Sequence, residues 1–489
     1  MADFLPICAA VLSRIEAPVT SSVTGGPGRD MRLPVSALPV VDRRRLSSHD
    51  ETTTKRTGAS GAQLTTPDTQ ETSTIRPTAD SNPERAEPSS PPAVIAGAFQ
   101  TGVLAVRTLT RRGVEAHSFD CRPNHPGFHS VYGRSHLCPN PDTDSEAWLE
   151  FMIQLAGIVG RKAVLIPSSD QFVSAMARHG TALEEHYTLS PGLRLQGELA
   201  DKQTQYDLAS RFGMPMPRTQ FATSVDEVAA FAREASFPCL MKPTHFREWK
   251  RFREGHPLLD SKVAIANSES ALLENYRLAC EVNPNVILQE IIQGPDTAKR
   301  VYLSCYNARG ERIAKAMFRE LRCDPVGFGP ASVSEPVIDD EADEICDRFL
   351  RAIGYVGICE IEVKRDTRDG RVKLIEANPR LSGGGDAAPY AGVDLCWLHY
   401  LDMVGTPVVP VGPRERHFKH IVVRADARAA LAYWHAGHIS IGDILRSYQP
   451  PLAFYDLDFR DWRYSAETLY VSGRAFFQEA FALLKRGTR

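Results

Sequence analysis

The chain has 489 residues, of which 43% are hydrophobic and 24% charged, and its formal net charge is −3. This composition is typical of a globular protein with a large core, and the length corresponds to about three domains. The near-neutral charge argues against a broad nucleic-acid-binding surface. No apolar run approaches the roughly 18 residues that a membrane-spanning helix needs, so we expect no membrane span.

The first 90 residues are rich in Ser, Thr, Pro and Gly, and Phe4 is their only aromatic residue. Such a segment buries too little apolar surface to offset its ordering entropy, so we expect a disordered tail over residues 1–90. The apolar patch at residues 5–12 follows Asp3 and no basic residues, which argues against a secretory signal; an organelle transit peptide stays an alternative. A basic trio in the tail is expected to be solvated, with an anionic partner as the alternative: Arg43, Arg44 and Arg45.

The ten cysteines are widely spaced and form no CxxC pair. Isolated cysteines of this kind are expected to be reduced thiols in a cytoplasmic protein. We therefore expect a cytoplasmic location.

Residues 91–195 follow a strand, Gly loop, helix, strand pattern, with strands near residues 94–96 and from 162, and a helix over about 101–111. Alternating strands and helices predict a doubly wound parallel sheet. The loop from Gly97 to Gly102 lacks the Lys and Ser/Thr of a P-loop, and Phe99 replaces the middle glycine of a dinucleotide fingerprint. We interpret it as a tight turn, with a substrate contact or a nicotinamide-dependent oxidoreductase as the alternatives.

From residue 197 the pattern changes to α+β. A helix capped by Thr223 or Ser224 precedes the short strand PCLMKP, and VILQEII at residues 286–292 predicts another strand. Arg309-Gly310 predicts the turn of a hairpin.

Residues 354–385 carry the most informative pattern. Strand alternation places Glu360, Glu362 and Lys364 on one face. The turn at Asp369-Gly370 would return the chain as an antiparallel strand. On that strand Glu376 and Asn378 share a face. The hairpin should bring Glu362 to within about one residue pair of them, so the carboxylates of Glu362 and Glu376 and the amide oxygen of Asn378 should converge.

Converging carboxylates repel one another unless a cation or proton lies between them, and hard oxygen ligands suit Mg²⁺. Arg380 follows Asn378 by two residues and would meet an anion bridged by the metal, an arrangement suited to phosphoryl transfer. The alternative is an exposed hairpin with acids on its solvated face. The Gly-rich loop over residues 383–385 favours the metal site, because a surface hairpin does not need it.

The order of these features resembles the ATP-grasp superfamily of carboxylate–amine ligases, of the carbamoyl-phosphate synthase and D-aspartate ligase type. The resemblance is carried by Lys202 in DKQ, Lys242 in FPCLMKP, the hinge QEIIQGPD and the pair EIEVKRD and KLIEANPR, over residues 93–410. It implies an ATP-grasp fold at 196–410, with a lid at about 215–285 and a metal hairpin at 354–385. A pre-ATP-grasp α/β domain at 91–195 would precede it, and an α/β extension at 411–489 would follow.

The resemblance also implies roles for individual residues. ATP phosphates would contact Lys202 and Lys242, the adenine pocket would include Glu290 and Ile292, and a ribose hydroxyl would bind Asp296. The Mg²⁺ ligands, with Mn²⁺ as an alternative ion, would be Glu362, Glu376 and Asn378, with Glu360 as the next candidate. The catalytic cations would be Arg380, at the transferring phosphate, and Arg322.

One segment, FRELRCDPVGFGP, departs from the family pattern. Many relatives read Lys-x-Arg before Pro and Gly; Arg322 matches, but Glu320 stands where the Lys is common. Arg319 is a candidate replacement for the missing cation, and a phosphate or substrate subsite is in doubt.

The implied reaction transfers the γ-phosphate of ATP to a substrate carboxylate, and an amine then displaces phosphate from the acyl phosphate. The partners would be a small-molecule carboxylate and amine, which the sequence does not identify. The alternative is a nucleotide-binding regulatory protein without turnover, motivated by Glu320 and the tail. The oligomeric state is open, with a homodimer as one candidate.

Other candidate residues carry weaker signals. His417 and His420 lack the partners of a zinc site. Asp386 is a candidate substrate contact. We expect the amphipathic C-terminal helix to dock on the body, with membrane-surface binding as the alternative, through a face that includes Phe476, Phe477, Phe481 and Leu484.

Overall fold

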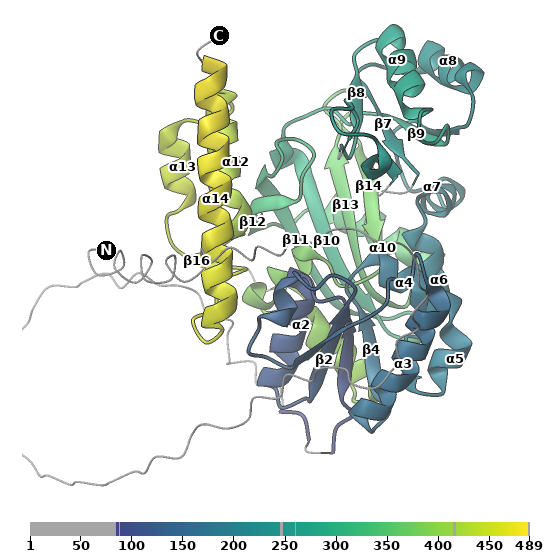
Figure 1. Ribbon diagram of the computed structural model, residues 1–489, viewed down its shortest axis with the longest axis vertical. Coiled ribbons are helices and arrows are strands. Elements are labelled where there is room, and N and C mark those ends of the chain that lie inside the picture. Colours follow the sequence, from purple (N-terminus) through teal and green to yellow (C-terminus); the bar gives the residue numbers. More distant parts are fainter. Residues whose placement is uncertain (1–84, 88, 245–247, 260, 414–416, 488–489) are drawn as a thin grey trace, which may run out of the picture. The chain divides into compact units, whose positions relative to one another are not determined.

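The structure is a computed structural model that describes residues 85–87, 89–244, 248–259, 261–413 and 417–487 (Figure 1). These residues lie within one compact unit, Gln70–Arg489. The tail predicted for residues 1–90 lies outside the described residues as far as residue 84, and so does its basic trio. None of the described helices combines the length and the apolar character needed to cross a membrane.

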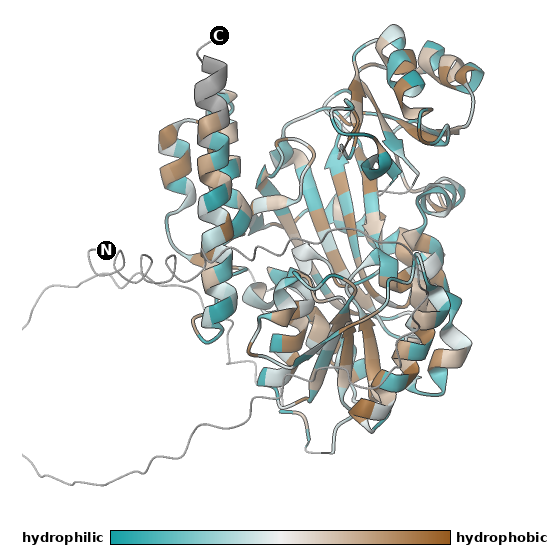
Figure 2. Cartoon of the chain, viewed as in Figure 1, coloured by the Kyte–Doolittle hydropathy of each residue, from teal (hydrophilic) through white to brown (hydrophobic). Residues whose placement is uncertain are grey.

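A five-stranded parallel sheet comes first, in the order β3-β2-β1-β4-β5 (Figure 1). The strands β1, β2 and β4 are buried along their whole length, as expected for central parallel strands covered by helices. Figure 2 shows hydrophobic residues gathered along the strands of this sheet. The predicted doubly wound arrangement is confirmed, and its elements are β1 (Ala93–Ala96), α2 (Gln100–Arg111), β2 (Ala116–Asp120), η1 (Pro126–Phe128), β3 (Arg134–Leu137), α3 (Ser145–Val159), β4 (Ala163–Pro167), α4 (Asp170–Arg178), α5 (Gly180–Glu184) and β5 (Tyr187–Thr188).

The glycines of the β1–α2 loop serve close packing. Gly97 has a φ of +125°, and a Cβ there would lie 2.5 Å from Oγ of Ser168. A Cβ on Gly102 would lie 1.9 Å from the carbonyl oxygen of Gly97. These contacts account for both glycines as parts of a tight strand-to-helix turn.

Two helices lead to a four-stranded antiparallel sheet in the order β6-β9-β7-β8. Ser224 caps α8 in a capping box with Glu227, which agrees with the predicted start of that helix. The strand β9 ends at Glu290, before the predicted end at Ile292. The elements are α6 (Leu193–Ala200), α7 (Lys202–Arg211), β6 (Thr219–Ala222), α8 (Val225–Glu234), β7 (Cys239–Pro243), η2 (Glu248–Arg251), β8 (Ala264–Ala266), α9 (Glu269–Ala279) and β9 (Val286–Glu290).

A seven-stranded sheet has the order β14-β13-β10-β11-β12-β15-β16, and only its last pair is parallel (Figure 1). The predicted turn at Arg309-Gly310 joins β10 to β11. Cys346 and Phe349 of α10 share a hydrophobic core with Ile361 and Leu374 of the sheet. The elements are η3 (Asp296–Ala298), β10 (Lys299–Tyr306), β11 (Arg312–Cys323), β12 (Ala331–Pro336), α10 (Asp340–Ala352), β13 (Gly357–Arg365) and β14 (Val372–Asn378).

The last segment adds helices and two edge strands. The C-terminal helix α14 packs on α12, where Ser472 donates a hydrogen bond to the carbonyl of Val423 at 2.8 Å. The predicted docking face is wrong, because Phe476, Phe477 and Phe481 are exposed, whereas smaller and polar side chains such as Ser472 are buried. The elements are η4 (Gly383–Asp386), η5 (Ala388–Ala391), α11 (Leu395–Met403), β15 (Lys419–Ile421), α12 (Val423–His435), α13 (Ile441–Ser447), β16 (Leu452–Phe454) and α14 (Trp462–Gly487).

Candidate functional site

The β13–β14 hairpin brings four polar side chains together. Its register pairs Glu362 with Glu376 and Glu360 with Asn378. The two carboxylates and the amide that were predicted to meet therefore occupy adjacent pairs on one face of the sheet. Because direct cross-strand neighbours lie about 5 Å apart at Cβ, the acids repel one another unless a cation or proton lies between them.

Glu360 lies at the buried end of this cluster. Its carboxylate accepts hydrogen bonds of 3.1 Å from Nδ2 of Asn378 and from the backbone N–H of Gly384. Burial, and then the neighbouring charge of Glu362, raises the pKa of Glu360 to about 7. A Cβ on Gly384 would lie 2.4 Å from Oε2 of Glu360, so the Gly-rich loop allows the backbone to approach this acid.

Two lysines neutralise the other acids. Lys202, at the start of α7, forms an ion pair with Glu376. Lys299 of β10 lies 3.0 Å from Glu362 and 3.0 Å from Glu320. Burial opposes the charged form of Lys202, but Glu376 and Asp170 outweigh it and raise the pKa of the lysine.

Lys299 is a site residue that the sequence reasoning missed. It sits at the strand position paired with Lys364 of β13, and the register alone would have shown that it can reach Glu362. The predicted replacement for the missing Lys at position 320, Arg319, is wrong: Arg319 pairs with Glu335. The cation beside Glu320 is Lys299.

Arg380 connects the hairpin to the N-terminal sheet. Its guanidinium binds Asp170, at the start of α4, through bonds of 2.6 and 2.8 Å, and it donates to Oδ1 of Asn378 at 3.2 Å. Burial opposes the charge of Arg380, but Asp170 raises its pKa. The predicted phosphate-binding arginine thus lies beside the carboxylate cluster.

Lys242 lies on the small antiparallel sheet, on β7. Its Nζ donates to the hydroxyl of Tyr206 at 3.0 Å and to Oε1 of Gln289 at 3.3 Å. Tyr206 in turn donates to the carbonyl of Ile375 on β14, the neighbour of Glu376, at 3.0 Å. A short chain of hydrogen bonds therefore joins Lys242 to the hairpin.

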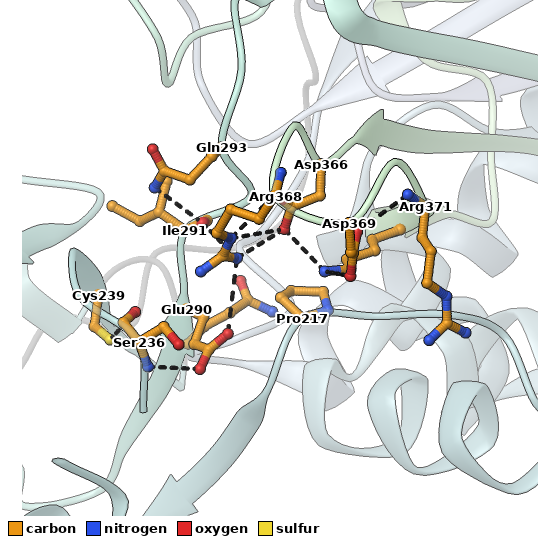
Figure 3. Close-up of polar contacts among 12 residues, drawn as sticks. Pro217, Ser236, Cys239, Glu290, Ile291, Gln293, Asp366, Arg368, Asp369 and Arg371 are labelled. Atoms are coloured by element: carbon orange, nitrogen blue, oxygen red, sulfur yellow. Dashed lines mark hydrogen bonds and ion pairs between the residues drawn. The ribbon is translucent and has the colours of Figure 1, made fainter. Parts of the chain in front are cut away.

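The hinge that follows β9 is attached to the turn of the same hairpin (Figure 3). Arg368 donates to the carbonyl of Ile291 at 3.2 Å and lies 3.7 Å from Glu290. Asp366 binds the same guanidinium at 2.7 Å, and the backbone N–H of Thr367 donates to the carbonyl of Gln293 at 3.1 Å.

The side chains of the hinge contribute in different ways. Glu290 accepts a hydrogen bond of 2.7 Å from the backbone N–H of Ser236, and Ile292 is buried. The two predicted adenine-site residues therefore help to shape the hinge.

Two predicted site residues are bound to the C-terminal segment instead. Tyr433 of α12 donates a hydrogen bond to Asp296. Arg322 is buried and binds Asp426 of α12 at 2.8 and 3.0 Å and Ser447 at 2.9 Å. The structure therefore does not bring Arg322 into the carboxylate cluster.

The oxygen donors of the cluster suit a hard divalent cation, because Glu362 and Glu376 face each other and attract cationic side chains from opposite sides. Within the described residues, no three His, Cys, Asp or Glu side chains are grouped to hold a metal by themselves. Asn378, phosphate oxygens and water would complete the coordination. Burial lowers the pKa of His420 to about 3, and His417 and His420 take part in no such group.

Solved structures identify the fold. N5-carboxyaminoimidazole ribonucleotide synthetase in an ADP complex aligns with a TM-score of 0.51 and 18% identity, covering 66% of this chain and 80% of that chain. The biotin carboxylase domain of Hydrogenobacter thermophilus 2-oxoglutarate carboxylase aligns with a TM-score of 0.51 and 15% identity, covering 66% and 71%. The chain has the ATP-grasp fold. The resemblance drawn from the sequence is confirmed at this level.

Curated relatives are distant, and no family model matches the chain. Formate-dependent phosphoribosylglycinamide formyltransferase of Ignicoccus hospitalis is 24% identical over 336 residues, 65% of this chain and 77% of the relative. D-aspartate ligase of Enterococcus faecium is 24% identical over 260 residues, 50% and 60% of the two chains. The carbamoyl phosphate synthase large chain of Thermus thermophilus is 26% identical over 251 residues, and only 23% of its length is covered.

Proposed function

We propose that this ATP-grasp protein is an ATP- and Mg²⁺-dependent ligase that activates a carboxylate as an acyl phosphate and joins it to an amine. The observation that carries the proposal is the hairpin cluster of Glu362, Glu376 and Asn378, with Lys202 and Arg380 at its edge. Mg²⁺ would neutralise the phosphate oxygens of the nucleotide and would be held by these three side chains.

Three cations near the cluster would act in this reaction. Lys202 and Lys242 would bind the phosphates of ATP, and the hinge from Glu290 to Ile292 would bind the base. Asp296 would accept a ribose hydroxyl in addition to the hydrogen bond that it accepts from Tyr433. Arg380 would hold the γ-phosphoryl group as it moves from ATP to the substrate carboxylate, with ADP as the leaving group. Positioning and charge neutralisation are the main contributions of a protein to such a transfer.

The second step breaks the bond between the acyl carbon and the phosphate oxygen. The amine nitrogen forms a bond to that carbon, and phosphate leaves with the electron pair. No protein nucleophile is needed, because the second substrate supplies it. The relatives of this chain, a D-aspartate ligase and a formate-dependent phosphoribosylglycinamide formyltransferase among them, support a ligase reaction.

The test is a screen for ADP release in which acyl phosphates are trapped as hydroxamates by hydroxylamine. Wild-type protein with Mg-ATP and a panel of small carboxylic acids should give ADP and a hydroxamate with at least one acid. Glu376→Gln should lower that rate by roughly 100-fold or more. The variant removes a proposed ligand of Mg²⁺, and the metal would then neutralise less of the charge that develops at the transferring phosphate.

A matched control is Glu341→Gln, since Glu341 forms an exposed ion pair with Arg365 of the same hairpin. Its rate should stay within about twofold of wild type. ATP binding without ADP release on any acid would contradict the ligase and support the second candidate, a nucleotide-binding regulatory protein. Glu320, in place of a cation, is the observation that favours that candidate.

A further inference from the structure

The C-terminal helix α14 is attached to the rest of the protein along one side. Tyr464, Thr468 and Ser472 are buried, and the hydrogen bond from Ser472 to the carbonyl of Val423 joins this side to α12. The three residues are four positions apart in the chain, so they lie on the same side of the helix. The phenylalanines of α14 are not part of this side.

The opposite side of α14 carries a face of exposed apolar residues, which we call the aromatic face. At about 3.6 residues per turn, Ala466, Tyr470 and Phe477 lie roughly opposite Thr468. The large side chains of the aromatic face are all exposed: Trp462, Leu469, Tyr470, Phe476, Phe477 and Phe481. Helices of globular proteins turn an apolar face of this width toward a core, but no element in the described part of the chain covers this one.

The aromatic face is larger than the apolar patch that a monomer usually exposes. A free side chain of this size exposes about 200 Å², and the exposed fractions of the six run from 39% to 64%, so together they expose about 650 Å². The largest apolar patch of a typical monomer is about 300–600 Å². Two copies of the face would bury about 1,300 Å², which lies within the range of about 1,200–2,000 Å² found for stable interfaces.

We propose that the protein is a homodimer in which two α14 helices pack antiparallel through their aromatic faces. A contact of this kind uses the same patch on both copies, so it closes at two subunits. The proposal is independent of the proposed ligase function, because the oligomeric state is measured without nucleotide or substrate.

Large and small residues are distributed on the aromatic face in a self-complementary way. A two-fold axis between residues 471 and 472 would pair Phe477 of one copy with Ala466 of the other, because the two positions are equally distant from it. The same axis would pair Tyr470 with Gly473, where an added Cβ would meet no atom within 4 Å. Each of these rings would therefore meet a residue that leaves room for it, as in a well-packed core.

The charges of the helix favour a protein partner over a membrane surface. Over residues 462–481, Arg463 and Arg474 are balanced by Glu467 and Glu479. Helices that lie on membranes combine an apolar face with a polar face rich in Lys and Arg. The polar residues of this stretch show no such basic excess, which agrees with a second copy of the chain as the partner.

Size-exclusion chromatography with light scattering on the full-length chain tests the dimer. Wild type should have the mass of a dimer at micromolar concentration. The double variant Phe477→Glu and Phe481→Glu should be a monomer with the circular dichroism spectrum of wild type, because a glutamate buried in the contact would lack a cation. Ile338→Glu is the control and should stay a dimer, since Ile338 is also exposed but lies between β12 and α10.

Ala466→Trp distinguishes the antiparallel fit from an unspecific apolar contact. The added ring enlarges the apolar face, but it would collide with Phe477 of the other copy. The dissociation constant of the dimer, measured by analytical ultracentrifugation, should therefore rise at least about tenfold. A dimer that becomes tighter in Ala466→Trp would overturn the proposal.

Two further results would also overturn it: a monomeric wild type, or a dimer that survives the two glutamates. Flotation with vesicles of phosphatidylcholine and phosphatidylserine then identifies the other occupant. If a monomeric wild type floated with the vesicles and the double variant did not, the aromatic face would bind a membrane and not a second copy.

Discussion

The β13–β14 hairpin and the end of strand β11 both carry residues that were predicted to act on phosphate, but their surroundings differ. In the hairpin, Glu362 and Glu376 face one another and are 14 positions apart in the chain. In β11, Arg322 binds Asp426, which is 104 positions away on α12. Charges in the hairpin face one another across a polar cluster, whereas the charge of Arg322 is enclosed by the C-terminal segment.

This difference separates two uses of a buried cation. Arg380 has an acid and an amide as neighbours next to the acidic cluster, where an incoming phosphate would compete for it. Arg322 is held by a carboxylate and a hydroxyl that belong to the fold. We therefore expect Arg380 to affect turnover and Arg322 to affect stability.

The largest effect should come from breaking the pair of Arg322 and Asp426. In Arg322→Met, the carboxylate of Asp426 stays buried without its cation, so the free energy of unfolding should fall by about 3–5 kcal/mol. Urea unfolding followed by circular dichroism measures it. Arg319→Met is the control: its pair with Glu335 is partly exposed, so the change should be below about 1 kcal/mol.

The same experiment tests the assignment of Arg322 to the fold. A double-mutant cycle with Asp426→Asn should show a strong coupling energy, because each single change leaves the other partner unpaired. If Arg322→Met kept wild-type stability but lost ADP release, Arg322 would serve the reaction, as we propose for the hairpin residues, and not the stability of the fold.

A second prediction concerns pH, and it applies to the hairpin. The pKa of Glu360 in the folded protein, about 7, lies above its ordinary value of 4.5 because the carboxyl is buried. Its protonated form therefore stabilises the fold at low pH, and this contribution is lost as pH rises from about 5 through 7. In metal-free buffer, the free energy of unfolding of Glu360→Gln minus that of wild type should therefore increase across this range, because wild type loses stability and the variant does not.

The control and the contrary result follow from the same reasoning. Glu341→Gln changes an exposed acid, so its difference from wild type should vary little over this range. A Glu360→Gln variant whose difference from wild type is also constant with pH would show that Glu360 is ionised throughout.

The sequence predicted those parts of the fold and site that depend on short-range patterns. Strand alternation and the Asp369-Gly370 turn placed Glu362 close to Glu376 and Asn378, and the structure pairs it directly with Glu376. The alternation of strands and helices predicted the parallel sheet. Lys299 was missed because its contact with Glu362 depends on which strand lies beside β13. That pairing comes from the sheet order and not from spacing in the chain.

Long-range partners account for the other differences. Tyr433 and Asp426 reach β11 from α12, and nothing in the sequence of β11 marks it as covered by that helix. The prediction of the face through which α14 docks was wrong for a related reason. Periodicity finds an apolar stripe such as Phe477 and Phe481, but it does not show whether any other element covers that stripe.

The smallest predicted effect concerns Arg368, which links the hairpin turn to the hinge. In Arg368→Met the hinge loses a donor to the carbonyl of Ile291 and the nearby charge beside Glu290, while the acidic cluster of the hairpin keeps its register. Because this hydrogen bond holds the hinge that we propose as the base site, and Arg368 has no contact with the acidic cluster, the KM for ATP should rise about 3- to 10-fold with kcat within about twofold. Arg371→Met in the same turn is the control, since the side chain of Arg371 points away from the hinge (Figure 3) and its KM should match wild type. A fall in kcat instead of a rise in KM would mean that the turn holds the metal-binding acids as well as the hinge, and the hairpin would then depend on distant contacts just as β11 does.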